Sequence, residues 1–203
     1  PSSLEGGERF LLSGVLKLSS SSALQFGSQL HFFMEQIHWA QGAYYQEARR
    51  AFSSKYGDIS TELQSHLLMF VENGPLSQIL TTDFYFKEPT SPLHGLENIT
   101  VESADFTVHN EYPICATVDG TLLRGFVDRL VIVRLNDTII AVDICDFKTD
   151  RVSGDSQELK ERVSHYRPQI NAYKKAIAQM FDLQLSQIGA RLIFTHAGVH
   201  EAI

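Results

Sequence analysis

Two acidic residues and a lysine stand within strongly apolar stretches of the sequence. In "AVDICDFKTDRV", residues 141–152, Asp146 and Lys148 continue an alternation begun by two apolar residues, Val142 and Ile144. An extended strand would therefore point all four side chains to one face. Asp128 lies in a second apolar stretch, "GFVDRLVIV". A buried carboxylate is unfavourable unless a hydrogen bond or an opposite charge compensates it.

The two aspartates are expected to lie close together. Asp128 is near the start of its strand, which places it across a hairpin from the far end of the next strand, where Asp146 lies. Two neighbouring carboxylates repel each other unless a cation joins them, and Mg²⁺ favours one or two carboxylates with water and phosphate oxygens. Lys148 could then orient or acidify an attacking water and offset charge on a phosphate. A lone D-x-K pattern is also compatible with a salt bridge at a strand end.

The apolar patterns predict an α/β fold in a single domain of 203 residues. Its core is a helix, three antiparallel strands, a helix and a final strand, which the helical crossover should place parallel to a neighbour. The expected elements are a helix over 24–52, interrupted near Gly42, a helix over 57–74 with a capping box at Thr61 and Gln64, a strand-like segment over 82–89, strands over 111–118, 121–135 and 138–149, a helix over 156–181 and a strand over 189–196. Residues 1–22 lead into the domain, and about 43–100 form a helical insertion.

Composition limits the classes of protein that the chain can represent. The net charge of −7 argues against a protein that coats nucleic acid by bulk positive charge. Cys115 and Cys145 are too few for a disulfide framework, and we expect both to be small apolar residues in strands. No apolar run approaches the roughly 18–20 residues needed to cross a bilayer. Because the sequence begins with proline and not methionine, we expect a fragment of a longer protein, although removal of an initiator methionine before proline would leave the same start.

Three motifs occur in order on the predicted elements: Gly125-Phe-Val-Asp128, Asp146-Phe-Lys-Thr-Asp150 and Tyr166-Arg-Pro-Gln169-Ile-Asn-Ala-Tyr173. Together they closely resemble the RecB/AddA-type nuclease domain of the PD-(D/E)XK superfamily. The resemblance extends to a G-x-x-x-H helix at Gly27 and His31, and to Glu111 before the glycine–aspartate strand. It spans about 27 to 196, although 43–100 carries no matching motif.

The resemblance implies a restriction-endonuclease-like core, with a mixed sheet flanked by helices, and assigns roles to individual residues. His31, Asp128, Asp146 and the backbone carbonyl of Phe147 would hold Mg²⁺ or Mn²⁺. Lys148 would be the catalytic lysine, and Glu111 a further acidic member of the site. Gln169 and Tyr173 would contact a DNA phosphate or order the site, with Tyr166 on the same helix face and Arg151 near the phosphate.

Each of these residues also has a purely structural interpretation. A helix histidine beside an apolar face, such as His31, is more often structural, and Glu111 could be a charge at a strand edge. Tyr166, Gln169 and Tyr173 fall at i, i+3 and i+7, which is also the spacing of core packing. Arg151 could belong to a solvated loop. Asp143 has the opposite parity from Asp146 and should face away from the site, as a solvated or helix-facing acid.

The resemblance also implies a biological setting. The expected activity is cleavage of single-stranded DNA or unwound DNA ends, with a helicase domain in the same polypeptide, possibly a second helicase–nuclease subunit, and a bacterial cytoplasmic, nucleoid-associated location without membrane contact. The sequence lacks a cysteine quartet for an iron–sulfur cluster and a phosphate-binding G-x-x-x-x-G-K-[ST] loop, so neither that cluster nor a nucleotide site is expected. The alternatives are a catalytically silent nuclease-fold module for DNA binding or helicase docking, and a hydrolase of small phosphoesters.

Overall fold

A five-stranded mixed sheet forms the centre of the computed structural model, which describes residues 21–71, 74–94, 96, 99–154 and 156–203. The strands follow one another in the order of the chain, and β3 and β4 pair in parallel across the helical crossover while the other neighbours are antiparallel. The strands are β1 (Asp105–Val118), β2 (Thr121–Leu135), β3 (Thr138–Lys148), β4 (Ile188–Phe194) and β5 (Val199–Ala202). This confirms the predicted α/β fold and parallel final pairing, to which β5 adds an unpredicted strand.

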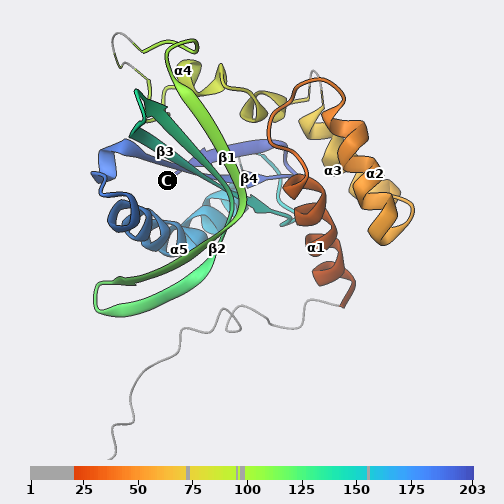
Figure 1. Cartoon of the computed structure of the whole chain (residues 1–203). Coiled ribbons are helices and arrows are strands. Elements are labelled where there is room, and N and C mark those ends of the chain that lie inside the picture. Colours follow the sequence, from red (N-terminus) through yellow and green to blue (C-terminus); the bar gives the residue numbers. More distant parts are fainter. Residues whose placement is uncertain (1–20, 72–73, 95, 97–98, 155) are drawn as a thin grey trace, which may run out of the picture.

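Helices cover both faces of the sheet, and Figure 1 shows the long α5 (Gln157–Phe181) on one side. The other side carries α1 (Ser21–Glu35), α2 (Tyr44–Tyr56), α3 (Thr61–Leu67), α4 (Phe84–Lys87) and short 3-10 turns at Leu68–Phe70 and Ser77–Leu80, while a third turn, Leu185–Gln187, precedes β4. The alternation in β3 separates two cores as predicted. Val142 and Ile144 pack in the α5 layer, whereas Cys145 and Phe147 pack in the α1 layer.

Several details of the predicted elements are wrong. The strand-like segment over 82–89 contains α4, because Phe84 and Tyr85 are both buried, which strict alternation along a strand would not allow. The first long helix ends at Glu35, and α2 begins after Gly42, whose φ is +59°. The cap of α3 is Ser60, not Thr61, since the Ser60 hydroxyl accepts a hydrogen bond from the Leu63 amide at 3.2 Å.

Two further expectations about side chains are confirmed only in part. Cys115 is exposed, while Cys145 is buried as expected. Asp143 does face away from Asp146, but it is buried rather than solvated, and Arg191 holds it through hydrogen bonds of 2.8 and 2.9 Å. A buried acid of this kind is tolerated because the guanidinium supplies both charge and donors.

The two-stranded ribbon of β1 and β2 twists so strongly that each of its faces changes from one helix layer to the other along its length. We call this change the turn-over of the ribbon. Val131 and Val133 pack in the α1 layer, whereas Val127, which has the same parity, packs in the α5 layer. Glu111 lies at this point of β1 with a φ of +51°, and strongly twisted ribbons of this kind are typical of isolated strand pairs. Beyond it the hairpin extends past the other strands and curls beneath α5 (Figure 1). The turn-over leaves the side chain of Asp128 between the two layers.

The insertion predicted over 43–100 contains α2, α3 and α4. Of the leading segment 1–22, residues 1–20 lie outside the described residues. Among the helices that the structure describes, none is long and apolar enough to cross a membrane.

Candidate active site

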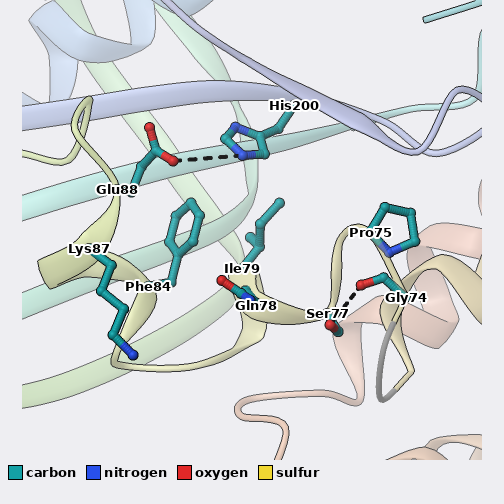
Figure 2. Close-up of a pocket in the computed structure, with 9 residues that line it drawn as sticks. All are labelled: Gly74, Pro75, Ser77, Gln78, Ile79, Phe84, Lys87, Glu88 and His200. Carbon is teal, nitrogen blue, oxygen red and sulfur yellow. Dashed lines mark hydrogen bonds and ion pairs between the residues drawn. The ribbon is translucent and has the colours of Figure 1, made fainter.

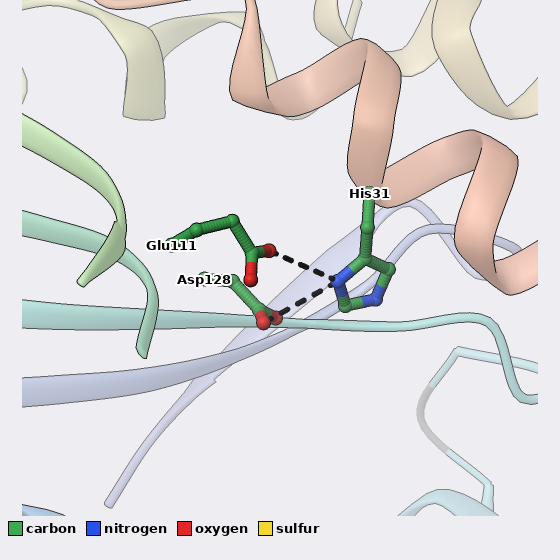
Figure 3. A group of neighbouring side chains, drawn as sticks. All are labelled: His31, Glu111 and Asp128. Carbon is green, nitrogen blue, oxygen red and sulfur yellow. Dashed lines mark ion pairs between the residues drawn. The ribbon is translucent and has the colours of Figure 1, made fainter. Parts of the chain in front are cut away.

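Three side chains from three elements converge where the β1–β2 ribbon turns over. Figure 3 shows His31 of α1, Glu111 of β1 and Asp128 of β2 pointing toward one another. The Nδ1 atom of His31 lies 3.3 Å from Asp128 Oδ1 and 4.0 Å from Glu111 Oε1. One ligand atom from each residue lies within 4.8 Å of the other two, which is close enough for all three to share one cation.

Asp128 connects this group to β3. Its Oδ2 accepts a hydrogen bond of 2.7 Å from the backbone amide of Phe147, while its Oδ1 faces His31. The carboxylate is therefore fixed by one oxygen to the central strand and presents the other to the site. The position of Asp128 opposite the end of β3 is the one that the hairpin predicted.

Asp146 and Lys148 form a buried ion pair beside the three converging residues. Lys148 Nζ lies 2.5 Å from Asp146 Oδ2, and the ammonium also lies 4.1 Å from the centre of the Tyr166 ring. Asp146 Oδ2 is nevertheless without a hydrogen bond of good geometry among the described residues. Asp146 is not one of the three residues whose ligand atoms converge. Its carboxylate contacts Lys148 instead.

The charges of the site perturb one another. Burial raises the pKa of Asp146, the negative charge of Asp128 raises it further, and Lys148 only partly opposes both, which leaves it at about 6. Burial and Asp128 also raise the pKa of Glu111. Burial lowers the pKa of His31, but its hydrogen bond and attraction to Asp128 outweigh burial, so the pKa is raised. Burial likewise lowers the pKa of Lys148, and Asp146 more than compensates.

Three carboxyl groups, those of Glu111, Asp128 and Asp146, share the site with one imidazole and one ammonium. When all three are ionised, the site therefore holds more negative charge than its own cations neutralise. The donor set of one imidazole nitrogen and two carboxylate oxygens, with the carboxylate of Asp146 beside it, fits a divalent ion such as Mg²⁺ or Mn²⁺.

Two polar side chains behind the site hold the end of α1. Asn110 precedes Glu111, Arg129 follows Asp128, and the two are paired across β1 and β2. Asn110 Nδ2 donates to the carbonyl oxygens of Glu35 at 2.7 Å and Ile37 at 3.1 Å. Arg129 donates to the same Ile37 oxygen at 2.9 Å and to that of His38. Nothing in the sequence pattern pointed to Asn110.

The predicted residues on α5 lie along one helix face, as expected, and each has a partner. Gln169 Nε2 donates to the Tyr173 hydroxyl at 3.1 Å, and Tyr173 is only 3% exposed. A Cβ at Gly125 would lie 2.7 Å from that hydroxyl, which explains why the motif before Asp128 begins with glycine. The Tyr166 hydroxyl donates to Asp150 at 3.0 Å.

Arg151 lies in the loop after β3. Its guanidinium pairs with Glu62 of α3, and both side chains are exposed. This contact joins the loop after β3 to the insertion.

A separate hollow of about 450 Å³ lies between α4 and β5 (Figure 2). Phe84, Lys87, Glu88 and His200 are among its lining residues, and His200 Nε2 lies 3.9 Å from Glu88 Oε2. None of the predicted site residues lines this hollow, so it is not part of the site described above.

Comparison with known families assigns the arrangement. The family model described as the PD-(D/E)XK nuclease superfamily matches residues 7–202, nearly the whole chain. No curated protein matches the sequence significantly. The match covers α1, the three antiparallel strands, the crossover helix and β4, which together supply every residue of the site. The chain therefore belongs to the PD-(D/E)XK nuclease superfamily.

Proposed function

We propose that the chain is a Mg²⁺- or Mn²⁺-dependent deoxyribonuclease domain that hydrolyses phosphodiester bonds. The observation that carries this proposal is the convergence of His31, Glu111 and Asp128 beside the buried Asp146–Lys148 pair. A structural salt bridge alone would account for Lys148 and Asp146, but it would not account for two further carboxylates gathered against one imidazole.

Each residue has a role that its position supports. His31, Asp128, Asp146 and the Phe147 carbonyl would hold the ion, with Glu111 as a further ligand. A bound dication would supply Lewis acidity to the phosphate. The ammonium of Lys148 is anchored by Asp146, so it can orient a water by hydrogen bonding and offset negative charge that develops on the phosphate. Gln169 and Tyr173 support the site from α5, while Tyr166 and Arg151 would lie at its edge.

The setting that we propose is a RecB/AddA-like helicase–nuclease that processes DNA ends for recombinational repair, with exonucleolytic cutting of single-stranded or unwound DNA. The acidic net charge of −7 favours delivery of the strand by a motor domain, because a free-standing DNA enzyme usually recruits phosphate with many lysines and arginines. Cleavage of a single-stranded oligonucleotide should therefore be slow for the isolated chain and accelerated by a fused helicase.

Replacement of Lys148 tests the catalytic assignment. Lys148→Met keeps most of the side-chain volume but removes the charge, and we expect Mg²⁺-dependent cleavage of a single-stranded oligonucleotide to fall by about 10²–10³-fold. The matched control is Lys87→Met, since Lys87 is an exposed lysine of α4 that pairs with Asp83 at 2.8 Å.

Thermal unfolding with and without Mn²⁺, and Mn²⁺ calorimetry, complete the experiment. We expect Lys148→Met to remain folded and still to bind Mn²⁺. Cleavage at the parent rate by the folded variant would show that the lysine assignment is wrong. A parent chain that binds no Mn²⁺ and cuts no DNA would instead favour the catalytically silent module.

A further inference from the structure

The outer face of the β1–β2 hairpin carries the two most exposed large hydrophobic side chains of the described residues. Phe126 is 58% exposed and Leu122 is 56% exposed, although both lie within a regular strand. Arg124, between them, is also exposed. Across the ribbon, Pro113, Cys115 and Thr117 are exposed as well, and the pairing places Pro113 opposite Phe126 and Cys115 opposite Arg124. We call these six residues the hairpin platform.

The opposite face of the same hairpin is firmly packed. Ile114, Val118 and Val127 are buried in the α5 layer, and the Tyr173 hydroxyl closely approaches Gly125. Lys175 of α5 also pairs with Asp119 at the hairpin tip at 2.5 Å. The exposure of Phe126 is therefore a property of a hairpin held in place on its other side, and not of a loose segment.

The hairpin platform continues directly from the metal-binding residues. Phe126 and Asp128 are two apart in β2, so their side chains leave the strand on the same face of the ribbon, with about 7 Å between them along the chain. In β1, Pro113 follows Glu111 by the same interval. A strand of DNA whose phosphate lies at Asp128 would pass over Phe126 next.

We propose that the hairpin platform binds the bases of single-stranded DNA next to the phosphate that is cut. Exposed aromatic rings stack on unpaired bases whatever their sequence, and arginine adds attraction to phosphate or to a base face. Phe126 would take the first base and Arg124 would follow it, with Leu122 as an apolar contact further out. This inference rests on the proposed nuclease function and deepens it by naming the surface that binds the bases of the substrate.

A protein partner fits the platform less well. A stable interface buries about 800 Å² and about 20–30 residues on each side, whereas the hairpin platform consists of six residues. Arg124 at its centre would also have to be desolvated. Unpaired DNA requires neither a large area nor loss of that charge.

Substitution of Phe126 tests the proposal. In buffer with a chelator, which prevents cleavage, Phe126→Ala should weaken binding of a single-stranded oligonucleotide by roughly 5- to 100-fold, and Phe126→Trp should restore it. The control is Leu185→Ala, because Leu185 is 50% exposed but lies in the 3-10 turn before β4. An oligonucleotide with abasic sugars should bind the parent as weakly as it binds Phe126→Ala.

Cys115 provides a second readout without substitution. It is one of two cysteines, and the other, Cys145, is buried, so maleimide should label Cys115 alone. Single-stranded oligonucleotide should slow this labelling in the parent and not in Phe126→Ala. Labelling that slows with protein concentration instead, together with a change of molecular mass in Phe126→Ala, would identify a second copy as the occupant and overturn the proposal.

The outcomes separate this inference from the nuclease proposal. Hydrolysis of a small phosphodiester, too short to reach Phe126, should be equal in the parent and in Phe126→Ala. If the parent cleaves DNA but Phe126→Ala binds the oligonucleotide as tightly as the parent, the platform assignment is wrong while the nuclease assignment stands. If the parent hydrolyses neither substrate with Mg²⁺ or Mn²⁺, the nuclease proposal itself fails.

Discussion

Glu111 shows how the site departs from relaxed backbone geometry. Its φ of +51° lies in the left-handed region, where a residue with a side chain of this length costs about 1 kcal/mol or more. The conformation turns its carboxylate toward His31 and the opposing Asp128. Backbone strain that brings two carboxylates together lowers the stability of the fold. A bound cation would compensate for it, so the strain supports a cation site at this point.

The raised pKa values predict that metal binding depends on pH. Because a metal ion binds the deprotonated ligands, Mn²⁺ affinity should increase as pH rises through about 6, where Asp146 loses its proton, and on above 6.5 as His31 loses its own. Calorimetry in two buffers of different ionisation enthalpy measures the protons released. Glu111→Gln serves as the comparison, and it should release fewer protons than the parent when Mn²⁺ binds. Affinity independent of pH from 5 to about 8 would contradict this assignment.

At this scale the sequence predicted the charged residues of the site but not those that hold them in place. Asp128, Asp146 and Lys148 are conspicuous because each is charged within an apolar strand. Asn110 is not, since a polar residue in a half-buried strand is common, and its function depends on a contact with the end of a helix about 75 positions earlier. Such contacts follow from tertiary packing.

Among the elements, the pair of Asn110 and Arg129 fixes α1 against the ribbon that carries Glu111 and Asp128. Both side chains bond the Ile37 carbonyl, so the helix that carries His31 is held to the same two strands as its acidic partners. Asn110→Ala should therefore weaken Mn²⁺ binding by about 10-fold, in the range seen when residues that orient metal ligands are removed, and should lower the free energy of unfolding by about 1–2 kcal/mol.

A matched substitution separates positioning from stability. Gln187→Ala also removes a bond from a side-chain amide to a backbone carbonyl, that of Ile140 at 3.0 Å, but at the far end of β3 from Asp146. It should lower stability similarly and leave Mn²⁺ affinity unchanged. Asn110→Asp removes the amide donor while keeping the shape, and should behave like Asn110→Ala. Equal affinity losses in Asn110→Ala and Gln187→Ala would mean that Asn110 is only structural.

The hairpins and the crossover helix could be predicted because their turn residues and periodicity are local signals. Asp119, Asn136 and Asp137 all have positive φ at the turns between the predicted strands, and the Ser156 hydroxyl accepts a hydrogen bond from the Leu159 amide at the start of α5. The turn-over of the β1–β2 ribbon could not be predicted, because parity assumes a flat strand. It decides that Val127 and Val131 face different layers, and so where Asp128 points.

In the molecule as a whole, polar contacts link the insertion to β3, the strand that carries Asp146 and Lys148. His66 of α3 lies 2.8 Å from the Thr195 hydroxyl through Nδ1, and that hydroxyl donates to the Lys148 carbonyl at 3.2 Å. The hydroxyl has one proton, so when it is donated to the Lys148 carbonyl, Nδ1 of His66 donates to the hydroxyl oxygen. No pattern in the sequence predicts this link, because 43–100 carries no family motif and His66 and Thr195 are far apart in the chain.

This link makes stability depend on the charge of His66. Burial lowers the pKa of His66, and the nearby His196 lowers it further, so the unfolded chain binds this proton more readily than the folded one. The contribution of His66 is therefore complete above the unfolded pKa of about 6.5 and is lost as pH falls through it. His66→Gln keeps a donor for Thr195 but cannot titrate, so its stability relative to the parent should rise as pH falls from about 7.5 to 5, measured by urea unfolding with chelator present. The same replacement at the exposed His165 should show no such trend, and a parent–variant difference constant over this range would contradict the prediction.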